Sequence, residues 1–121
     1  LSGTWSDPYT GQRMTLTDLK DPAQARSIPI DHRVALGSAW RYGAAAWDDA
    51  RRLVFANDLD NLQPVSEHSN ESKSDLDAAA WRPPKAAQCD FATHYVAIKA
   101  RYALAVDMSE KSALRQMLQT C

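Results

Sequence analysis

The sequence predicts a single α+β domain with two short strands, a helical insertion between them and a helical C-terminal third. Its length of 121 residues is close to the usual size of one domain, so we treat residues 1–121 as one unit. Hydrophobic residues make up 45% of the chain and charged residues 24%, which is ordinary for a globular protein. Short apolar segments at 28–34 and 62–65 are typical of strands, whereas apolar residues beyond residue 90 recur with a helical period.

The first half of the chain is predicted mainly from its turn-forming residues. Gly, Asp, Thr and Pro are frequent up to residue 27 and show little periodicity, which favours turns. Pro29 indicates that the first apolar segment is a strand at a sheet edge. In order along the chain, we expect turns with one or two short strands at 1–27, a strand at 28–34, a short helix at 37–46, a helix capped by Asp48 that runs to about Asn57, and a returning strand at 62–65.

The second half is predicted to be helical, because capping residues precede apolar stripes. Ser66 is a suitable N-cap for a helix that carries Asn70 and Lys73. Asp77 is expected to cap a short Ala-rich turn, and residues 107–110, Asp-Met-Ser-Glu, form a capping box before the last helix. The apolar stripes of the last two helices are Phe91, Tyr95, Ile98 and Tyr102, and then Ala113, Leu114, Met117 and Leu118.

The two cysteines, Cys89 and Cys121, favour a disulfide over a metal site. Zinc sites with four protein ligands normally show paired Cys or His at short spacing, which this chain lacks. If the last two helices run antiparallel, their packing would bring these cysteines close. The bond would be worth about 3 to 4 kcal/mol in the chain-constraint model and would indicate an oxidising compartment. Two buried free thiols in a cytosolic protein are the alternative.

Three short motifs carry the residues with candidate chemistry: Asp31-His32, Asn61-Leu62, and Asn70 followed by Lys73. Together these residue types suit hydrolysis of a phosphodiester, which requires an activated water, a cation at the scissile phosphate and stabilisation of the leaving oxygen. His32, with an ordinary pKa of about 6.5, is suited to take a proton from water near neutral pH. Asp31 and Asn70 offer the oxygen ligands that Mg²⁺ or Mn²⁺ prefers. Asn61 would bond the backbone of the loop that holds the histidine.

Each motif also has a simpler interpretation when it is taken singly. An Asp-His pair is a common coincidence, Asn61 is suited to a turn, and Asn70 could cap or interrupt a helix. Adjacent residues of a regular strand point to opposite faces, so we expect the strand to end or bulge at Asp31-His32 if both serve one site. Short motifs become convincing only through their context, which here is their order and the nine-residue step from Asn61 to Asn70.

With these motifs in this order, the chain resembles HNH (ββα-metal) nucleases. Its flanking sequence is similar to the secreted bacterial HNH-family proteins related to the C-terminal nuclease domain of GmrSD-type restriction enzymes. The similarity covers nearly the whole chain, so it is more specific than the three motifs alone. The matching segments are Gly3–Gly11, Ala39–Ala44, Arg52–Leu59, Trp81–Pro84 and, towards the C-terminus, Cys89, Tyr95, Ile98-Lys99, Tyr102, Glu110, Leu114, Met117-Leu118 and Cys121.

This resemblance implies a ββα-metal finger with a helical insertion and a C-terminal helical pair. It implies a secreted or periplasmic bacterial endonuclease that cuts nucleic acid, DNA rather than RNA, with low sequence specificity. Members usually carry Pro, a basic residue and Gly where this chain has Ala35, Glu71 and Ser74, which bears on substrate affinity and loop geometry. The implied roles are general base for His32, support of the histidine loop for Asn61, ligands of Mg²⁺ or Mn²⁺ for Asp31 and Asn70, and phosphate contact for Lys73 or Arg33.

Charge and hydropathy narrow the classes of function. A net charge of −1 gives no general attraction to a polyanion, so nucleic-acid binding would need a local basic patch. The chain has no run of about 18 apolar residues and no signal-like N-terminal segment, so we expect no membrane span. Because it opens on Leu1 instead of Met, we expect a processed or excised form. The basic-patch candidates are Arg33, Arg41, Arg51, Arg52 and Lys73, although Arg51 and Arg52 could equally be solvated helix residues.

The other histidines and the tryptophans are expected to belong to the scaffold. His68 is expected to be exposed or to contact a site residue, and His94 to lie at the surface. A Ser-His-Asp hydrolase is disfavoured, because Asp31 directly precedes His32 and no Ser stands in a nucleophile elbow. The four tryptophans are expected in the core or as clamps between parts of the domain, with stacking on bases as the alternative: Trp5, Trp40, Trp47 and Trp81.

Three functions therefore remain open. The leading expectation is a metal-dependent endonuclease. A non-catalytic module that binds nucleic acid or protein through a weakened site is the alternative that the departures at Ala35, Glu71 and Ser74 motivate. An exported antibacterial nuclease toxin with a cognate inhibitor protein is the third.

Overall fold

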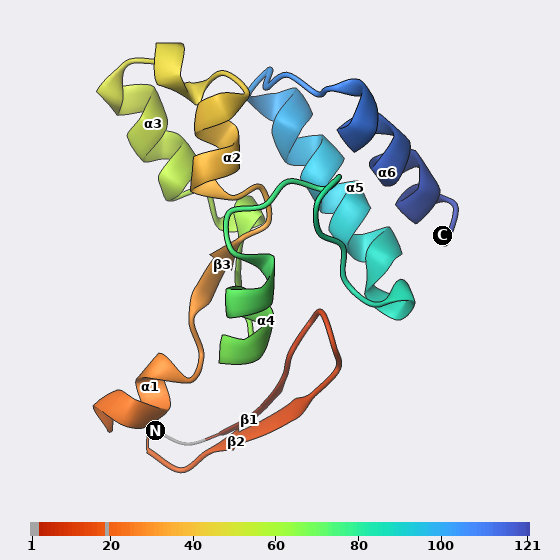
Figure 1. Cartoon of the computed structure of the whole chain (residues 1–121). Coiled ribbons are helices and arrows are strands. Elements are labelled where there is room, and N and C mark those ends of the chain that lie inside the picture. The colour runs from red at the N-terminus through yellow and green to blue at the C-terminus, as the bar shows by residue number, and fades with distance from the viewer. Residues whose placement is uncertain (1–2, 19) are drawn as a thin grey trace.

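The N-terminal segment folds as a hairpin followed by one helical turn. The computed structural model describes residues 3–18 and 20–121, so Leu1 lies outside the described residues (Figure 1). Strands β1 (Gly3–Ser6) and β2 (Arg13–Leu16) pair antiparallel. Helix α1 (Pro22–Arg26) follows, with the side chain of Asp21 accepting from the Ala23 N–H as its N-cap. The sequence predicts the strands but not α1, because a five-residue helix is too short to show an apolar period.

A second antiparallel pair holds the sequence motifs. Strands β3 (Ile30–His32) and β4 (Leu62–Pro64) pair with Asp31 opposite Gln63 and His32 opposite Leu62. β3 ends at His32, where we expect the strand to end or bulge, and it is shorter than the predicted strand at 28–34. The insertion between the strands consists of α2 (Leu36–Arg41), a 3₁₀ turn (Ala44–Ala46), α3 (Asp49–Ala56) and a second 3₁₀ turn (Leu59–Asn61).

The insertion has two helices where the sequence predicts them, but the first is shorter than expected. Gly43 has a φ of 142°, a backbone conformation that L side chains rarely adopt, and it separates α2 from the 3₁₀ turn. The predicted helix at 37–46 is therefore two pieces. Asp48 caps α3 through the Arg51 N–H, as predicted.

Helix α4 (Glu67–Lys73) follows β4 directly and begins at the predicted N-cap. The Ser66 hydroxyl accepts from the Ser69 N–H at 3.1 Å. The helix ends at Ser74, whose φ of 48° and ψ of −140° lie in a region that favours glycine. This is the position at which the family resemblance leads us to expect Gly.

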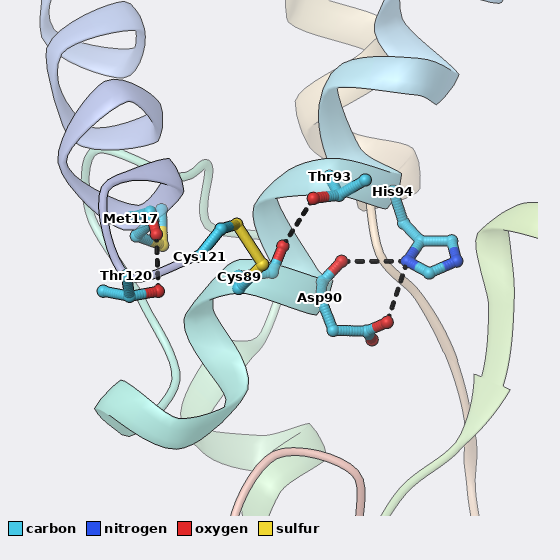
Figure 2. Close-up of a disulfide and its surroundings, with 7 residues drawn as sticks. All are labelled: Cys89, Asp90, Thr93, His94, Met117, Thr120 and Cys121. Carbon is cyan, nitrogen blue, oxygen red and sulfur yellow. Dashed lines mark hydrogen bonds and ion pairs between the residues drawn. A yellow bond between two sulfur atoms is a disulfide. The ribbon is translucent and has the colours of Figure 1, made fainter.

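Two antiparallel helices, α5 (Lys85–Arg101) and α6 (Met108–Leu118), form the C-terminal pair (Figure 1). A disulfide joins Cys89 in the first turns of α5 to Cys121, just beyond α6, with their Cα atoms 5.1 Å apart (Figure 2). The predicted disulfide and the antiparallel pair are both confirmed. None of the described helices is long and apolar enough to cross a membrane.

The capping box predicted at 107–110 is only half formed. Asp107 accepts from the Glu110 N–H at 2.8 Å, but the Glu110 carboxylate does not return to the Asp107 N–H. It is completely buried and accepts instead from the Tyr95 hydroxyl and the Lys99 ammonium. Local spacing predicted the cap, but the buried partners on α5 decide where the carboxylate goes.

The apolar core lies between the C-terminal helices, the insertion and the hairpin loop. Trp47 and Trp81 pack against it as expected. Trp40 does not, because 53% of it is exposed on α2, and the prediction of a core or clamping role is wrong for this residue. The residues that make up the buried cluster are Tyr9, Val34, Ala39, Ala44, Phe55, Val65, Ala78, Phe91, Ala92, Tyr95, Ile98, Tyr102, Leu104, Ala113, Leu114 and Met117.

Candidate active site

The end of β3 and the helix α4 bring three of the predicted site residues to one hollow. Asp31, His32 and Asn70 line a shallow depression of about 170 Å³. Its other lining residues come from β3, from the start of α2 and from the segment after α4. They are Ile30, Ala35, Leu36, Gly37, Ser74 and Asp75.

The His32 imidazole is held by a backbone carbonyl at the end of α3. Its Nε2 lies 2.9 Å from the Ala56 oxygen. A carbonyl oxygen only accepts, so Nε2 must carry the hydrogen in this contact, and the neutral ring then keeps its lone pair on Nδ1. The insertion therefore fixes the tautomer in which Nδ1 can accept a proton.

Asn61 binds the loop that follows His32. Its Oδ1 accepts from the Val34 N–H at 2.9 Å and its Nδ2 donates to the Val34 oxygen at 3.1 Å. Its own backbone oxygen accepts from the Arg33 N–H at 2.8 Å. Asn61 and Val34 are both fully buried, so these bonds are shielded from water. This geometry is what a loop-supporting amide requires, and its importance for catalysis stays a prediction.

Asp31 is buried between two donors. One carboxylate oxygen accepts from the Tyr9 hydroxyl, and the other lies 3.1 Å from the Lys73 ammonium. Lys73 also donates to the His32 backbone oxygen at 2.7 Å and is only 1% exposed. Burial lowers the pKa of Lys73 below its ordinary value, and the Asp31 carboxylate works against that shift.

Lys73 thus stabilises the site from its buried side. Its ammonium ties the end of α4 to both residues of the Asp31-His32 pair. The sequence places Lys73 on the same helical face as Asn70, which is why it was expected to touch substrate phosphate. An ammonium that is buried and already bonded is poorly placed for such a contact.

The hairpin loop supplies two residues whose roles the sequence analysis missed. Tyr9 bonds Asp31 as described above, and its own pKa is raised by burial and by the neighbouring carboxylate. Asp7 accepts from the Ser66 N–H at 3.0 Å and from the Ser69 hydroxyl at 2.6 Å, at the start of α4. Burial would raise the pKa of Asp7, but these bonds and those from Thr10 outweigh it and lower the pKa.

The hairpin loop therefore contacts both β3 and the start of α4. Asp7 positions α4, which carries Asn70, and Tyr9 positions the carboxylate of β3. Both residues lie within a segment that matches the resembled family. That match is the signal that could have marked them, although it does not reveal their partners.

Of the remaining residues, Asn70 lines the hollow, whereas Arg33 and His68 are not among its lining residues. Asn70 is half-buried and lines the hollow, and no hydrogen bond from its side chain is seen among the described residues. Arg33 donates from Nη1 to the Asp60 oxygen at 2.9 Å, on the exposed side of the loop. His68 is exposed, as one of its two expected placements has it.

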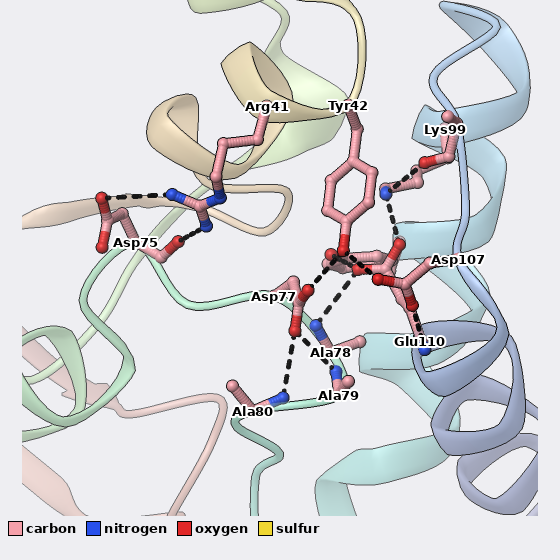
Figure 3. A network of polar contacts seen from close by, with 12 residues as sticks. Arg41, Tyr42, Asp75, Asp77, Ala78, Ala79, Ala80, Lys99, Asp107 and Glu110 are labelled. Carbon is pink, nitrogen blue, oxygen red and sulfur yellow. Dashed lines mark hydrogen bonds and ion pairs between the residues drawn. The ribbon is translucent and has the colours of Figure 1, made fainter.

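Asp75 is an acidic residue of the hollow that the sequence analysis gave no role. Arg41 donates to its backbone oxygen at 3.0 Å and lies 3.9 Å from its carboxylate (Figure 3). Next to it, the Tyr42 hydroxyl lies 2.6 Å from an Asp77 carboxylate oxygen and 2.8 Å from one of Asp107, and its single hydrogen is shared between them. These contacts tie α2 to the segment after α4, so both walls of the hollow are held.

The hollow offers oxygen ligands of the kind that Mg²⁺ prefers. Asp31 and Asp75, which line it, carry carboxylates, and Asn70 carries an amide oxygen, although Asp31 is only 4% exposed. An ionised carboxylate has about four acceptor sites, so Tyr9 and Lys73 do not exhaust those of Asp31. Within residues 3–18 and 20–121, no three His, Cys, Asp or Glu residues gather as a ready metal cluster. The donor set therefore fits a hard cation that retains several waters and does not fit zinc.

Comparison with known proteins finds a family match over nearly the whole chain. Residues 1–117 match the family described as GmrSD restriction endonucleases, C-terminal domain. A protein of Arthroderma benhamiae, described as an uncharacterized secreted protein, is 39% identical over 123 residues. The alignment covers 99% of this chain and 56% of that protein, so the chain spans little more than half of its relative. The relative is fungal, so it gives the expected bacterial origin no support.

Proposed function

The chain belongs to the family of the GmrSD restriction endonuclease C-terminal domain, and from this premise we propose that it is a metal-dependent endonuclease of the HNH type. The proposed reaction is hydrolysis of phosphodiester bonds in nucleic acid, DNA rather than RNA, with low sequence specificity. The strands β3 and β4 followed by α4 would be its ββα-metal unit, with α2 and α3 as the helical insertion.

The observation that carries this proposal is the placement of His32. Its Nε2 is tied to the Ala56 oxygen, and the residue lines the same hollow as Asp31 and Asn70. A general base needs a free lone pair and a fixed ring, and this contact provides both. In the proposed reaction, His32 takes a proton from water at Nδ1, the hydroxide attacks the phosphorus, and the bond from phosphorus to the leaving ester oxygen breaks. That oxygen leaves as an alkoxide and takes a proton from solvent.

Other residues of the chain hold this base in position. Asn61 fixes the loop after His32 through both Val34 backbone groups, and Lys73 fixes the His32 backbone oxygen. Arg33 lies on the exposed side of that loop and is the better candidate for a phosphate contact, because Lys73 is buried.

Mg²⁺ or Mn²⁺ is the proposed cofactor, and Asp31 and Asn70 are its proposed ligands, with Asp75 as a further oxygen donor of the hollow. When bound, the cation would polarise the scissile phosphate and stabilise the leaving oxygen. We further propose that the protein works outside the cytoplasm. The disulfide and the secreted relative support that location.

A non-catalytic binding module is the second candidate. It is favoured by the ion pair between Asp31 and Lys73, which neutralises a proposed metal ligand within the protein itself. A net charge of −1 also gives little general attraction to nucleic acid.

The experiment that separates these candidates compares His32→Ala with His94→Ala in plasmid nicking. His94 lies on α5, and within the described part of the chain its hydrogen-bond and ion-pair partner is the neighbouring Asp90, so it serves as the matched control. His32→Ala should lower turnover by about 10² to 10⁴, the usual effect of a positioned acid-base group, while Mn²⁺ affinity by calorimetry stays near that of the parent. Equal nicking by both variants would remove His32 from the reaction.

A second set of variants separates the two asparagine roles. Asn70→Asp should keep part of the activity, because another oxygen donor replaces a ligand, whereas Asn70→Ala should lose most of it. Asn61→Asp should impair nicking about as much as Asn61→Ala, because both lose the donor to Val34. If Asn61 variants lose the metal while Asn70 variants keep it, the roles are exchanged.

A further inference from the structure

An exposed apolar ridge runs from the hollow along α2. It consists of Ile30, Leu36 and Trp40, which are 58%, 48% and 53% exposed. Ile30 and Leu36 line the hollow itself. Trp40 is four residues after Leu36 and therefore on the same face of α2, about 6 Å further along the helix. The ridge thus connects the candidate site to an exposed indole ring.

The Trp40 ring is held in place although it is exposed. The Arg52 guanidinium of α3 lies over it, 5.3 Å from the ring centroid. That guanidinium is itself fixed, since it donates to the Trp47 oxygen at 2.6 Å and the Ala44 oxygen at 3.1 Å and pairs with Asp49 at 2.7 Å. A bound partner would therefore meet a preorganised ring.

The charges around the ring favour an anionic partner. Arg52 lies against the indole and Arg41 follows Trp40 directly on α2. Arg41 is 54% exposed at its side chain; it donates to the Asp75 backbone oxygen at 3.0 Å, and its ion pair with the Asp75 carboxylate is loose, at 3.9 Å. Sequence-tolerant binders of single-stranded nucleic acid combine these two features, a flat aromatic ring for the base and cations for the backbone.

We propose that Trp40 stacks on an unpaired base of a nucleic acid whose scissile phosphate lies in the hollow, so that the substrate is single-stranded or locally unpaired. The inference rests on the proposed function, because the hollow is taken as the reaction site. Bases inside a duplex already stack on their neighbours and present no free face, so an indole beside the hollow can stack only on a base that has left the duplex. Leu36 lines the hollow, and Trp40 lies about 6 Å further along α2. With a rise of about 3.4 Å per stacked nucleotide, Trp40 would meet the base about two nucleotides from the one that lies beside Leu36.

The test measures binding without cleavage, in the His32→Ala variant. A labelled oligothymidine and a labelled duplex of the same length are titrated with this protein, alone and combined with Trp40→Ala, Trp40→Phe or Met108→Ala. Met108 is 82% exposed at the start of α6 and is the matched control. Trp40→Ala should weaken single-strand binding by about 5- to 150-fold, the measured range for loss of one base stack. Duplex binding should stay unchanged, and Trp40→Phe should retain most of the affinity.

Three results would overturn the inference: equal losses for strand and duplex, no loss in Trp40→Ala, or no binding of either oligonucleotide. A shift from dimer to monomer in Trp40→Ala, seen by sedimentation, would also overturn it and assign the ridge to a second copy of this chain. Failure of the proposed function can be told apart from failure of this inference. If the proposed function is wrong, the parent protein cleaves neither the single strand nor the duplex. The inference is tested separately, because the difference in affinity between Trp40→Ala and Trp40→Phe is measured without cleavage.

Discussion

Replacement of Asn61 should destabilise the fold because the loop after β3 depends on its side chain. Asn61→Ala removes an acceptor from the Val34 N–H and a donor from the Val34 oxygen, and both groups are buried. Each buried polar group left without a partner costs about 1 to 3 kcal/mol, so the variant should lose about 2 to 6 kcal/mol of unfolding free energy. For a chain of this size, that loss corresponds to a fall in Tm of about 8 to 24 °C.

Asn61→Asp separates the hydrogen bonds from the packing volume. Asp has nearly the same size, but it cannot donate to the Val34 oxygen and places a carboxylate against it. It should therefore be at least as unstable as Asn61→Ala at neutral pH. Asn57→Ala is the control, because Asn57 is exposed and donates only to the Leu53 oxygen. Thermal unfolding followed by circular dichroism gives all three values. A Tm for Asn61→Ala equal to that of the Asn57 variant would refute the reasoning.

Three further predictions concern stability. Native protein should be lighter than reduced protein by two hydrogen atoms, and loss of the Cys89 to Cys121 bond should lower unfolding free energy by about 3 to 4 kcal/mol; two free thiols would contradict this. Ser74→Gly should raise the unfolding free energy by about 1 kcal/mol, because the positive φ strains any L side chain. A lowered Tm would contradict that strain. The pKa of Asp7 is lowered, so its contribution to stability is complete above the ordinary value of 3.8 and is lost as pH falls through the folded-state pKa. Asp7→Asn should therefore reduce the dependence of Tm on pH in acid. An unchanged slope of Tm against pH would count against this role of Asp7.

The sequence predicts those parts of the fold that depend on neighbouring residues. The N-caps Asp48, Ser66 and Asp107 are confirmed, because a cap needs only a side chain and the N–H groups of the next turn. The disulfide is confirmed because two cysteines allow a single intramolecular pairing. The general order of strand, insertion, strand and helix follows from apolar patterning and turn residues in the same way.

Long-range contacts could not be predicted from local pattern. Asp7 bonds Ser69, 62 residues away, and Tyr9 bonds Asp31, 22 residues away. Nothing in the spacing of these residues indicates the pairing, because it depends on where the hairpin loop packs. Burial of Lys73 was missed for the same reason, since a helical face can be identified from sequence but its partner cannot.

Trp40 was predicted to be buried but is exposed, whereas Lys73 was not predicted to be buried and is. A tryptophan is usually mostly buried, so composition predicts a core role for each of the four. Trp47 and Trp81 follow that rule, but Trp40 lies on the outer face of α2 beside Arg52. Single exposed apolar residues are common, but Trp40 lies on the same ridge as Ile30 and Leu36, and contiguous apolar patches more often mark interaction sites.

The central claim, that the hollow between β3 and α4 hydrolyses phosphodiesters with the help of a metal, is tested most directly by cleavage of supercoiled plasmid. The folded, disulfide-bonded protein is incubated with Mg²⁺, with Mn²⁺ and with EDTA, beside the His32→Ala variant. We predict nicked and then linear plasmid with either metal, no product with EDTA, and a strongly slowed reaction in the variant. If supercoiled plasmid and single-stranded circular DNA both stay intact with both metals, or if cleavage persists in EDTA, the claim is contradicted.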